Sequence, residues 1–116
     1  MARRLMRMDA HALPGGGTIF VARTVGQRLL GLMGLESMPP GSALLLADCR
    51  SVHTAWMRMA IDVVFLDADG GVLAVRRGLR PWRVARCRGA AAVLECQAGG
   101  ADALLSGRCF RAATPA

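Results

Sequence analysis

The sequence predicts an α+β domain that is mainly β: a compact antiparallel, barrel-like sheet with one or two short helices. Short apolar runs rich in β-branched side chains recur along the chain and are separated by turn residues. Fourteen glycines in 116 residues favour many turns over long helices. A hydrophobic content of 53% is enough for the core of a single domain of this length.

The N-terminal segment, residues 1–17, is expected to be a flexible arm. It closes with Pro14 and three glycines, and little in it calls for burial. The single domain is expected to span residues 18–112. Its first element is a short β-prone run, Thr18–Arg23.

The best helical pattern covers Thr24–Gly34. Thr24 and Gln27 have the spacing of a capping box, in which each side chain binds a free backbone N–H at the helix start. Apolar residues then recur on one helical face, namely Val25, Leu29, Leu32 and Met33. Gly34 is a plausible C-terminal stop.

The middle of the chain predicts buried strands and a hairpin. Ala43–Ala47 is a continuous apolar run of the kind found in a strand buried on both faces. The central segment, Val52–Asp67, starts with polar and aromatic groups and continues into a β-branched core strand. Asp67–Gly71 is a turn signal joining Asp62–Leu66 to Val72–Val75.

The last third combines an arginine-rich segment with another strand. Arg76–Arg88 carries six of the fifteen arginines and one proline, which predicts loop and edge strand. Ala91–Gln97 is predicted as a strand and Gly99–Gly107 as one or two helical turns. Residues 108–111 are predicted to form a last short strand.

The charge balance favours anionic partners. The net charge is +7, and every basic residue is an arginine. No apolar run approaches the ~20 residues of a membrane span, and the start lacks the apolar stretch of a signal peptide, so we expect a soluble, cytoplasmic protein. The four cysteines form no CxxC pair, which disfavours a zinc ribbon, and we expect neither a metal nor a cofactor.

The candidate site lies at the start of the central strand. If residues 53–59 are extended, Thr54, Trp56 and Arg58 share one face. An indole beside a guanidinium and a hydroxyl is a usable surface for an anionic or small polar ligand. The full set of candidate ligand-binding residues is His53, Thr54, Trp56, Arg58, Asp62, Arg80, Trp82 and Arg83. The competing interpretation is a half-buried Trp covered by an Arg stem.

The leading interpretation is a small binding or accessory domain, and two other functions compete with it. Cys49, His53 and Asp62 have the residue types of an activated thiolate, which suggests a hydrolase or transferase. Against it, Asp62 at a strand entry equally suits a partner of Arg58 or an acceptor of backbone N–H groups. The arginines of Arg76–Arg88 around Trp82 suggest a nucleic-acid-associated protein, although such a run is often a solvated edge. We expect binding rather than catalysis, because no complete catalytic set appears.

Five segments, in order, carry a family resemblance: GLMG (Gly31–Gly34), CRSVHT (Cys49–Thr54), MRMAIDVVFLD (Met57–Asp67), LRPWRV (Leu79–Val84) and VLECQAG (Val93–Gly99). The chain resembles the family called domain of unknown function 192 over about Val21 to Phe110. The resemblance implies a compact, mainly β fold with one or two helices and no established activity. Three positions depart from the family's usual residues: Leu35 replaces Arg, Ala60 replaces Pro, and Gly107-Arg108 replaces Gly-Asp.

Overall fold

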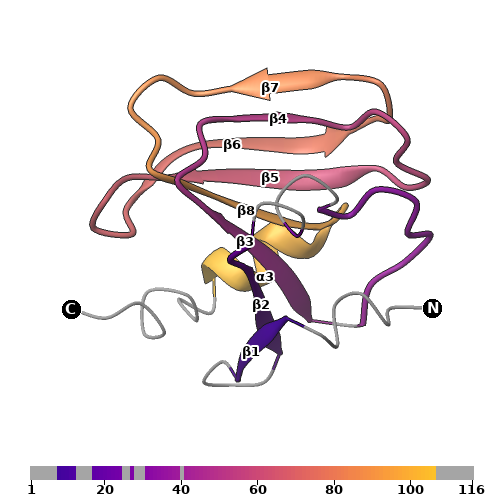
Figure 1. Cartoon of the computed structure of the whole chain (residues 1–116), viewed down its shortest axis with the longest axis horizontal. Helices are drawn as coiled ribbons and strands as arrows, with labels where there is room; N and C mark the ends of the chain where they lie inside the picture. The colour runs from indigo at the N-terminus through magenta and orange to yellow at the C-terminus, as the bar shows by residue number, and fades with distance from the viewer. Residues whose placement is uncertain (1–7, 13–16, 25–26, 28–30, 40, 107–116) are drawn as a thin grey trace.

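The computed structural model describes residues 8–12, 17–24, 27, 31–39 and 41–106. These residues form a six-stranded sheet, a two-stranded ribbon and a short helix (Figure 1). The strands are β1 (Asp9–Ala12), β2 (Thr18–Ala22), β3 (Ser42–Ala47), β4 (Ser51–His53), β5 (Ile61–Leu66), β6 (Val72–Leu79), β7 (Val84–Arg86) and β8 (Ala92–Gln97), and the helix is α3 (Gly100–Ser106). The predicted mainly β, α+β fold is confirmed.

The large sheet is mixed and open. Its strand order is β1-β2-β3-β8-β5-β6, and β4 and β7 pair separately as the ribbon. β2 and β3 are parallel, whereas the other neighbours in the sheet are antiparallel. The sheet therefore differs from the expected antiparallel, barrel-like one. The reason is the long connection between β2 and β3, which crosses over and returns the chain in the same direction.

β5 lies inside the sheet and organises both of its faces. All six of its residues are buried, and it pairs with β8 on one side and β6 on the other. Because side chains alternate along a strand, Ile61, Val63 and Phe65 enter one core, whereas Val64 and Leu66 enter the other. The central segment is thus a core strand, as the sequence predicts.

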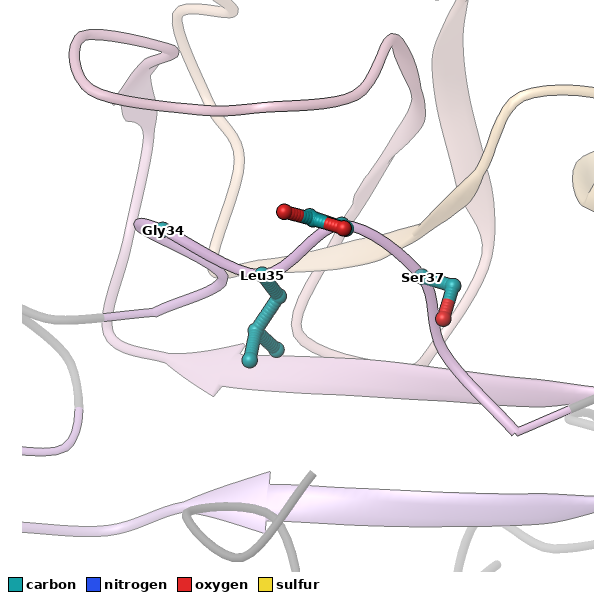
Figure 2. A pocket seen from close by; sticks show the side chains of 4 residues that line it. Gly34, Leu35 and Ser37 are labelled. Carbon is teal, nitrogen blue, oxygen red and sulfur yellow. The ribbon is translucent and has the colours of Figure 1, made fainter. Parts of the chain in front are cut away.

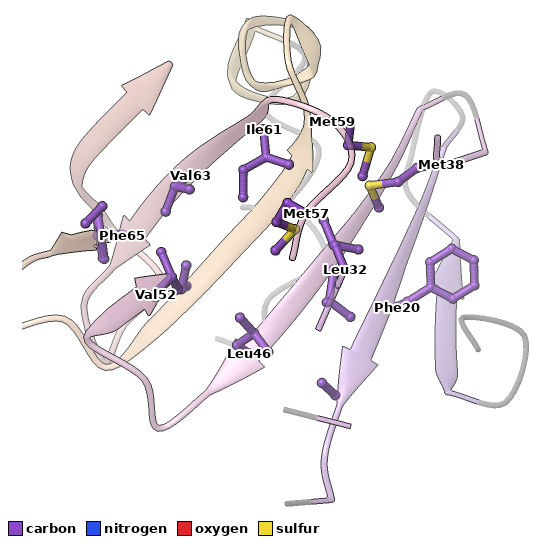
Figure 3. Close-up of a cluster of buried hydrophobic side chains, with 14 of the residues drawn as sticks. Phe20, Leu32, Met38, Leu46, Val52, Met57, Met59, Ile61, Val63 and Phe65 are labelled. Atoms are coloured by element: carbon purple, nitrogen blue, oxygen red, sulfur yellow. The ribbon is translucent and has the colours of Figure 1, made fainter. Parts of the chain in front are cut away.

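Different elements pack over the two cores. On the first face, the ribbon contributes Val52 and Ala85, and the connecting segments contribute apolar side chains (Figure 3), namely Leu32, Met38, Met57 and Met59. On the second face, α3 contributes Ala101 and Leu104. Among the described residues, a ribbon and connecting segments therefore cover the first face, and α3 covers the second.

Two local predictions are confirmed. The Thr24 hydroxyl oxygen accepts the Gln27 N–H at 3.0 Å, and Gln27 Oε1 accepts the Thr24 N–H at 3.2 Å, which is a reciprocal capping box. Much of the helix predicted over Thr24–Gly34 lies outside the described residues. The β5–β6 hairpin closes where expected, with Asp67 Oδ1 accepting the N–H groups of Asp69 and Gly71 at 2.9 and 2.8 Å.

Other segments differ from expectation or extend it. Residues 53–59 are not one extended strand, because β4 ends at His53 and turns follow. Within the predicted N-terminal arm, Asp9–Ala12 forms β1 against β2, and Met8 is buried. The strand predicted at residues 108–111 lies outside the described residues. Within the described part, no helix has the length and apolarity needed to cross a membrane.

Candidate functional site

Three connecting segments meet beside the first core: residues 31–37, 54–60 and 80–83. The first two are joined by a hydrogen bond from the Gly34 N–H to the Trp56 carbonyl oxygen at 3.0 Å. The second and third are joined through Thr54. Segments far apart in the sequence are therefore held together by backbone hydrogen bonds, and the predicted site residues lie mostly on them.

Thr54 is the buried centre of this junction. Its side chain is fully buried, its hydroxyl donates to the Arg80 carbonyl oxygen at 2.5 Å, and it accepts the Arg83 N–H at 2.7 Å. Its own N–H donates to the Arg83 carbonyl oxygen at 2.8 Å, and its carbonyl oxygen accepts the Trp82 N–H at 3.0 Å. Thr54 therefore positions the 80–83 segment, and its buried hydroxyl is engaged by backbone groups; its hydrogen bond to a ligand stays a prediction.

Trp56 and Trp82 form an exposed aromatic pair at the same junction. Their ring centroids lie 4.8 Å apart in an edge-to-face arrangement with an interplanar angle of 62°. The two residues are 64% and 58% exposed, although tryptophan is normally largely buried. Both backbones have positive φ, 64° and 65°, a conformation that is unfavourable for bulky side chains. The sequence brought these residues forward as candidates but gave no sign of their strained backbone.

Three exposed arginines lie within two residues of Trp56 or Trp82 in the sequence, namely Arg58, Arg80 and Arg83. Arg80 and Arg83 are exposed and flank Trp82 in sequence, and Arg83 Nη1 donates to the Trp82 carbonyl oxygen at 3.3 Å. Arg58 is exposed and forms an ion pair with Glu36 at 3.0 Å. Because Glu36 is also exposed, this pair is accessible to solvent and to competing anions.

A surface hollow lies along the first segment. It has a volume of about 360 Å³ and is lined by Gly34, Leu35, Glu36 and Ser37 (Figure 2). Leu35, one of the lining residues, packs against the first core. The backbone of the hollow's first lining residue, Gly34, is hydrogen-bonded to the Trp56 carbonyl oxygen. The sequence analysis did not indicate this hollow.

Asp62 lies apart from this junction. It is 2% exposed, and its carboxylate accepts the N–H groups of Gly78, Gly99 and Ala101 at 2.8, 2.9 and 3.1 Å. The last two precede and begin α3. Asp62 therefore fixes the end of β6 and the start of α3, as the alternative of a backbone N–H acceptor implies; its role in ligand binding stays a prediction.

The thiolate arrangement suggested by Cys49, His53 and Asp62 is not assembled. Asp62 has its oxygens occupied by backbone N–H groups, so it does not orient an imidazole. His53 is exposed on β4, and its Nδ1 accepts the Ala55 N–H at 3.3 Å. The Cys49 thiol donates to the Ser51 carbonyl oxygen at 3.2 Å. Across the described residues there is also no group of three His, Cys, Asp or Glu side chains placed to hold a metal ion.

A second buried carboxyl, Glu95 on β8, was missed by the sequence reasoning. It is 2% exposed, and its Oε1 has no hydrogen-bond partner among the residues that the structure describes. Burial raises its pKa to about 7. Burial also raises the pKa of the neighbouring Cys96 thiol to about 12, with smaller contributions from Asp62 and Glu95, so Cys96 is a poor nucleophile. The sequence did contain a signal, because an acidic residue inside the apolar run AVLECQ indicates a buried carboxyl.

Comparison with known proteins places the chain in a family. The family model for domain of unknown function 192 (DUF192), described as "Uncharacterized ACR", matches residues 9–106. The chain belongs to the DUF192 family. The resemblance drawn from the five sequence segments is thereby confirmed, and the family carries no established activity. No match was found among curated proteins.

Two solved structures share the fold of this DUF192 protein. One is a protein of Sinorhizobium meliloti described as "a putative transcription regulator", with a TM-score of 0.67, 24% identity and 82% of each chain covered. The other is a protein of unknown function from Novosphingobium aromaticivorans, with a TM-score of 0.66, 20% identity, and 82% of this chain and 75% of that chain covered. At these identities the likeness concerns the fold alone.

Proposed function

We propose that this DUF192 protein is a small binding domain that holds an anionic ligand with a planar group at the Trp56–Trp82 pair. The indoles supply flat apolar faces for the planar part. The neighbouring guanidinium groups of Arg58, Arg80 and Arg83 supply the donors for the anionic part, because guanidinium matches carboxylate and phosphate geometry.

The strained, exposed aromatic pair is the observation that carries this proposal. Two large side chains more than half exposed forgo the stabilisation that burial would give them. Each also has a positive φ, which costs roughly 1–3 kcal/mol where a non-glycine residue adopts it. A purely structural role would favour glycine at such positions and burial for such rings. Exposed aromatic rings on a strained backbone are typical of a recognition site, where function offsets the lost stability.

Intrinsic fluorescence tests the proposal directly, because the two tryptophans of the pair are the only ones in the chain. We expect thymidine 5′-monophosphate, which carries a planar ring and a phosphate, to change the emission saturably. Arg83→Ala is expected to weaken this binding about tenfold, the loss of one charge-assisted contact. Inorganic phosphate, which lacks the planar group, is expected to bind more weakly than the nucleotide.

Arg23→Ala is the matched control, because it removes the same charge from an exposed arginine that directly follows β2. Figure 1 shows β2 and β7 on opposite sides of the molecule. This variant should bind the nucleotide as the unmodified protein does. Equal weakening in Arg23→Ala and Arg83→Ala would show that net charge alone attracts the probe. An emission spectrum unchanged by millimolar nucleotide would remove the proposal.

A further inference from the structure

The outer face of the β4–β7 ribbon continues the aromatic pair as a row of exposed side chains. In both strands the middle residue is buried and its neighbours are exposed, so Val52 and Ala85 face the core. Val84 and Arg86 of β7 are exposed on the opposite face. Trp82 and Arg88, two residues before and after them, are exposed as well. These exposed side chains lie on β7 and on the bend and the turn that flank it, so the surface extends beyond the aromatic pair.

The ribbon and its flanking segments are uniformly basic. Residues 49–61 and 70–94 contain two and six arginines respectively, which is eight of the fifteen, and no Asp or Glu. Within the described part of the chain, two of these eight have acidic partners: Arg58 pairs with Glu36 and Arg77 with Asp102. The six others, including Arg80, Arg83, Arg86 and Arg88, form no ion pair there. An extended surface with unneutralised cations favours an extended polyanion.

The aromatic pair at one end of this row selects among polyanions. Bases of a single-stranded nucleic acid stack on exposed aromatic side chains while arginines follow the phosphates. In a duplex the base faces are stacked on one another and are inaccessible to an indole on a ribbon surface. An acidic protein would engage the arginines but gives no reason for the exposed, strained indoles.

We infer that the outer face of the β4–β7 ribbon, from the Trp56–Trp82 pair to Arg88, binds single-stranded nucleic acid. Bases stack on the indoles, and the phosphates that follow contact Arg86 and Arg88. This inference rests on the proposed function and extends it, because the single anion held at the aromatic pair becomes one unit of a polymer that continues along β7.

The decisive measurement is the binding of a fluorescein-labelled twelve-residue oligothymidylate, followed by anisotropy and by tryptophan emission at several salt concentrations. We expect it to bind at least tenfold more tightly than thymidine 5′-monophosphate and more tightly than a duplex of the same length. Trp82→Ala should weaken binding at least fivefold, the effect of losing one stacked base. Arg86→Ala and Arg88→Ala should each lower the slope of log affinity against log salt by about 0.7.

Control variants separate the inference from simple charge attraction. Arg23→Ala should leave the salt slope unchanged, and Trp82→Phe should restore most of the stacking lost in Trp82→Ala. Circular dichroism of each variant verifies the fold. Oligonucleotide binding that is indifferent to both tryptophans would overturn the inference, because it would show non-specific charge attraction.

Two outcomes distinguish this inference from the proposed function. Saturable nucleotide binding without tighter oligonucleotide binding overturns the inference and leaves the proposed function standing. Failure of both probes removes both. Vesicles of phosphatidylserine and phosphatidylcholine form the last arm: a blue shift of the tryptophan emission on vesicles, with none on the oligonucleotide, would assign the surface to membranes and overturn the inference.

Discussion

Two buried carboxyl groups, Asp62 on β5 and Glu95 on β8, lie on neighbouring strands in opposite environments. Both are 2% exposed. Asp62 accepts three backbone N–H groups, whereas Glu95 has one oxygen without a partner among the described residues. In the strand register Asp62 lies opposite Cys96 and Val63 lies opposite Glu95, so the two side chains leave the sheet on different faces.

The comparison shows that partners decide what a buried carboxyl does for the fold. Asp62 lies where the chain ends β6 and begins α3, and it satisfies N–H groups that otherwise would have no acceptor. Glu95 lies between apolar neighbours, because Leu44 and Val63 flank it on the adjacent strands. Its charged form is penalised by desolvation, as the raised pKa of about 7 indicates. The first group stabilises the fold by its hydrogen bonds, and the second destabilises it when charged.

Removal of Asp62 is expected to have the largest effect. Asp62→Ala leaves three N–H groups without their acceptor and should lower the free energy of unfolding by about 4 kcal/mol. Urea denaturation followed by circular dichroism measures this change. Asp69→Ala, which removes an exposed carboxylate from the β5–β6 turn, is the control and should change the stability little. Similar midpoints for the two variants would mean that the hydrogen bonds of Asp62 contribute little.

Neutralising Glu95 should raise the stability, whereas removing Asp62 lowers it, and the gain should depend on pH. The folded-state pKa of about 7 lies above the ordinary value of 4.5, so the folded protein keeps a proton that the unfolded chain releases. The stability contributed by this proton is fully present below about pH 4.5 and is lost as pH rises through 7. At pH 8 we expect Glu95→Gln to be more stable than the unmodified protein by roughly 3 kcal/mol, with no difference at pH 4.

Denaturation midpoints at several pH values test this sign. Glu36→Gln, which changes an exposed glutamate, should give a pH profile parallel to that of the unmodified protein. The pH profile of Glu95→Gln could also be parallel to that of the unmodified protein, or the variant could be less stable at pH 8. Either result would mean that ionised Glu95 has a favourable partner, and the contrast with Asp62 would disappear.

The smallest change in stability is expected at the aromatic pair, where the unfavourable contribution comes from backbone strain and not from a buried charge. Trp82→Gly removes the side chain and permits the φ of 65°, whereas Trp82→Ala keeps a Cβ in that conformation. We expect the glycine variant to be more stable than the alanine variant by about 1 kcal/mol. Thermal denaturation of the two variants measures the difference. A more stable alanine variant would indicate that residue 82 leaves the left-handed region once the indole is gone.

The locally encoded features were predicted well. The Thr24–Gln27 capping box and the Asp67–Gly71 hairpin both depend on residues within four positions of one another. The apolar runs at β3, β5 and β8 became buried strands, since their composition alone favours extended, buried structure. Residues 53–59 failed as an extended strand because positive φ at Trp56 turns the chain, and no sequence pattern assigns positive φ to tryptophan.

The apolar core strands, the hairpin and the basic character of residues 76–88 could be predicted from the sequence, because they follow from periodicity, turn residues and composition. The family followed from the five matching segments. Which side chains meet depends on the tertiary structure. The donors to Asp62 lie 16, 37 and 39 residues away, and Thr54 meets its partners 26 and 29 residues further on. Such contacts depend on strand order and crossover, which spacing along the chain does not specify. The same long-range packing left Trp56 and Trp82 in contact with each other and open to solvent.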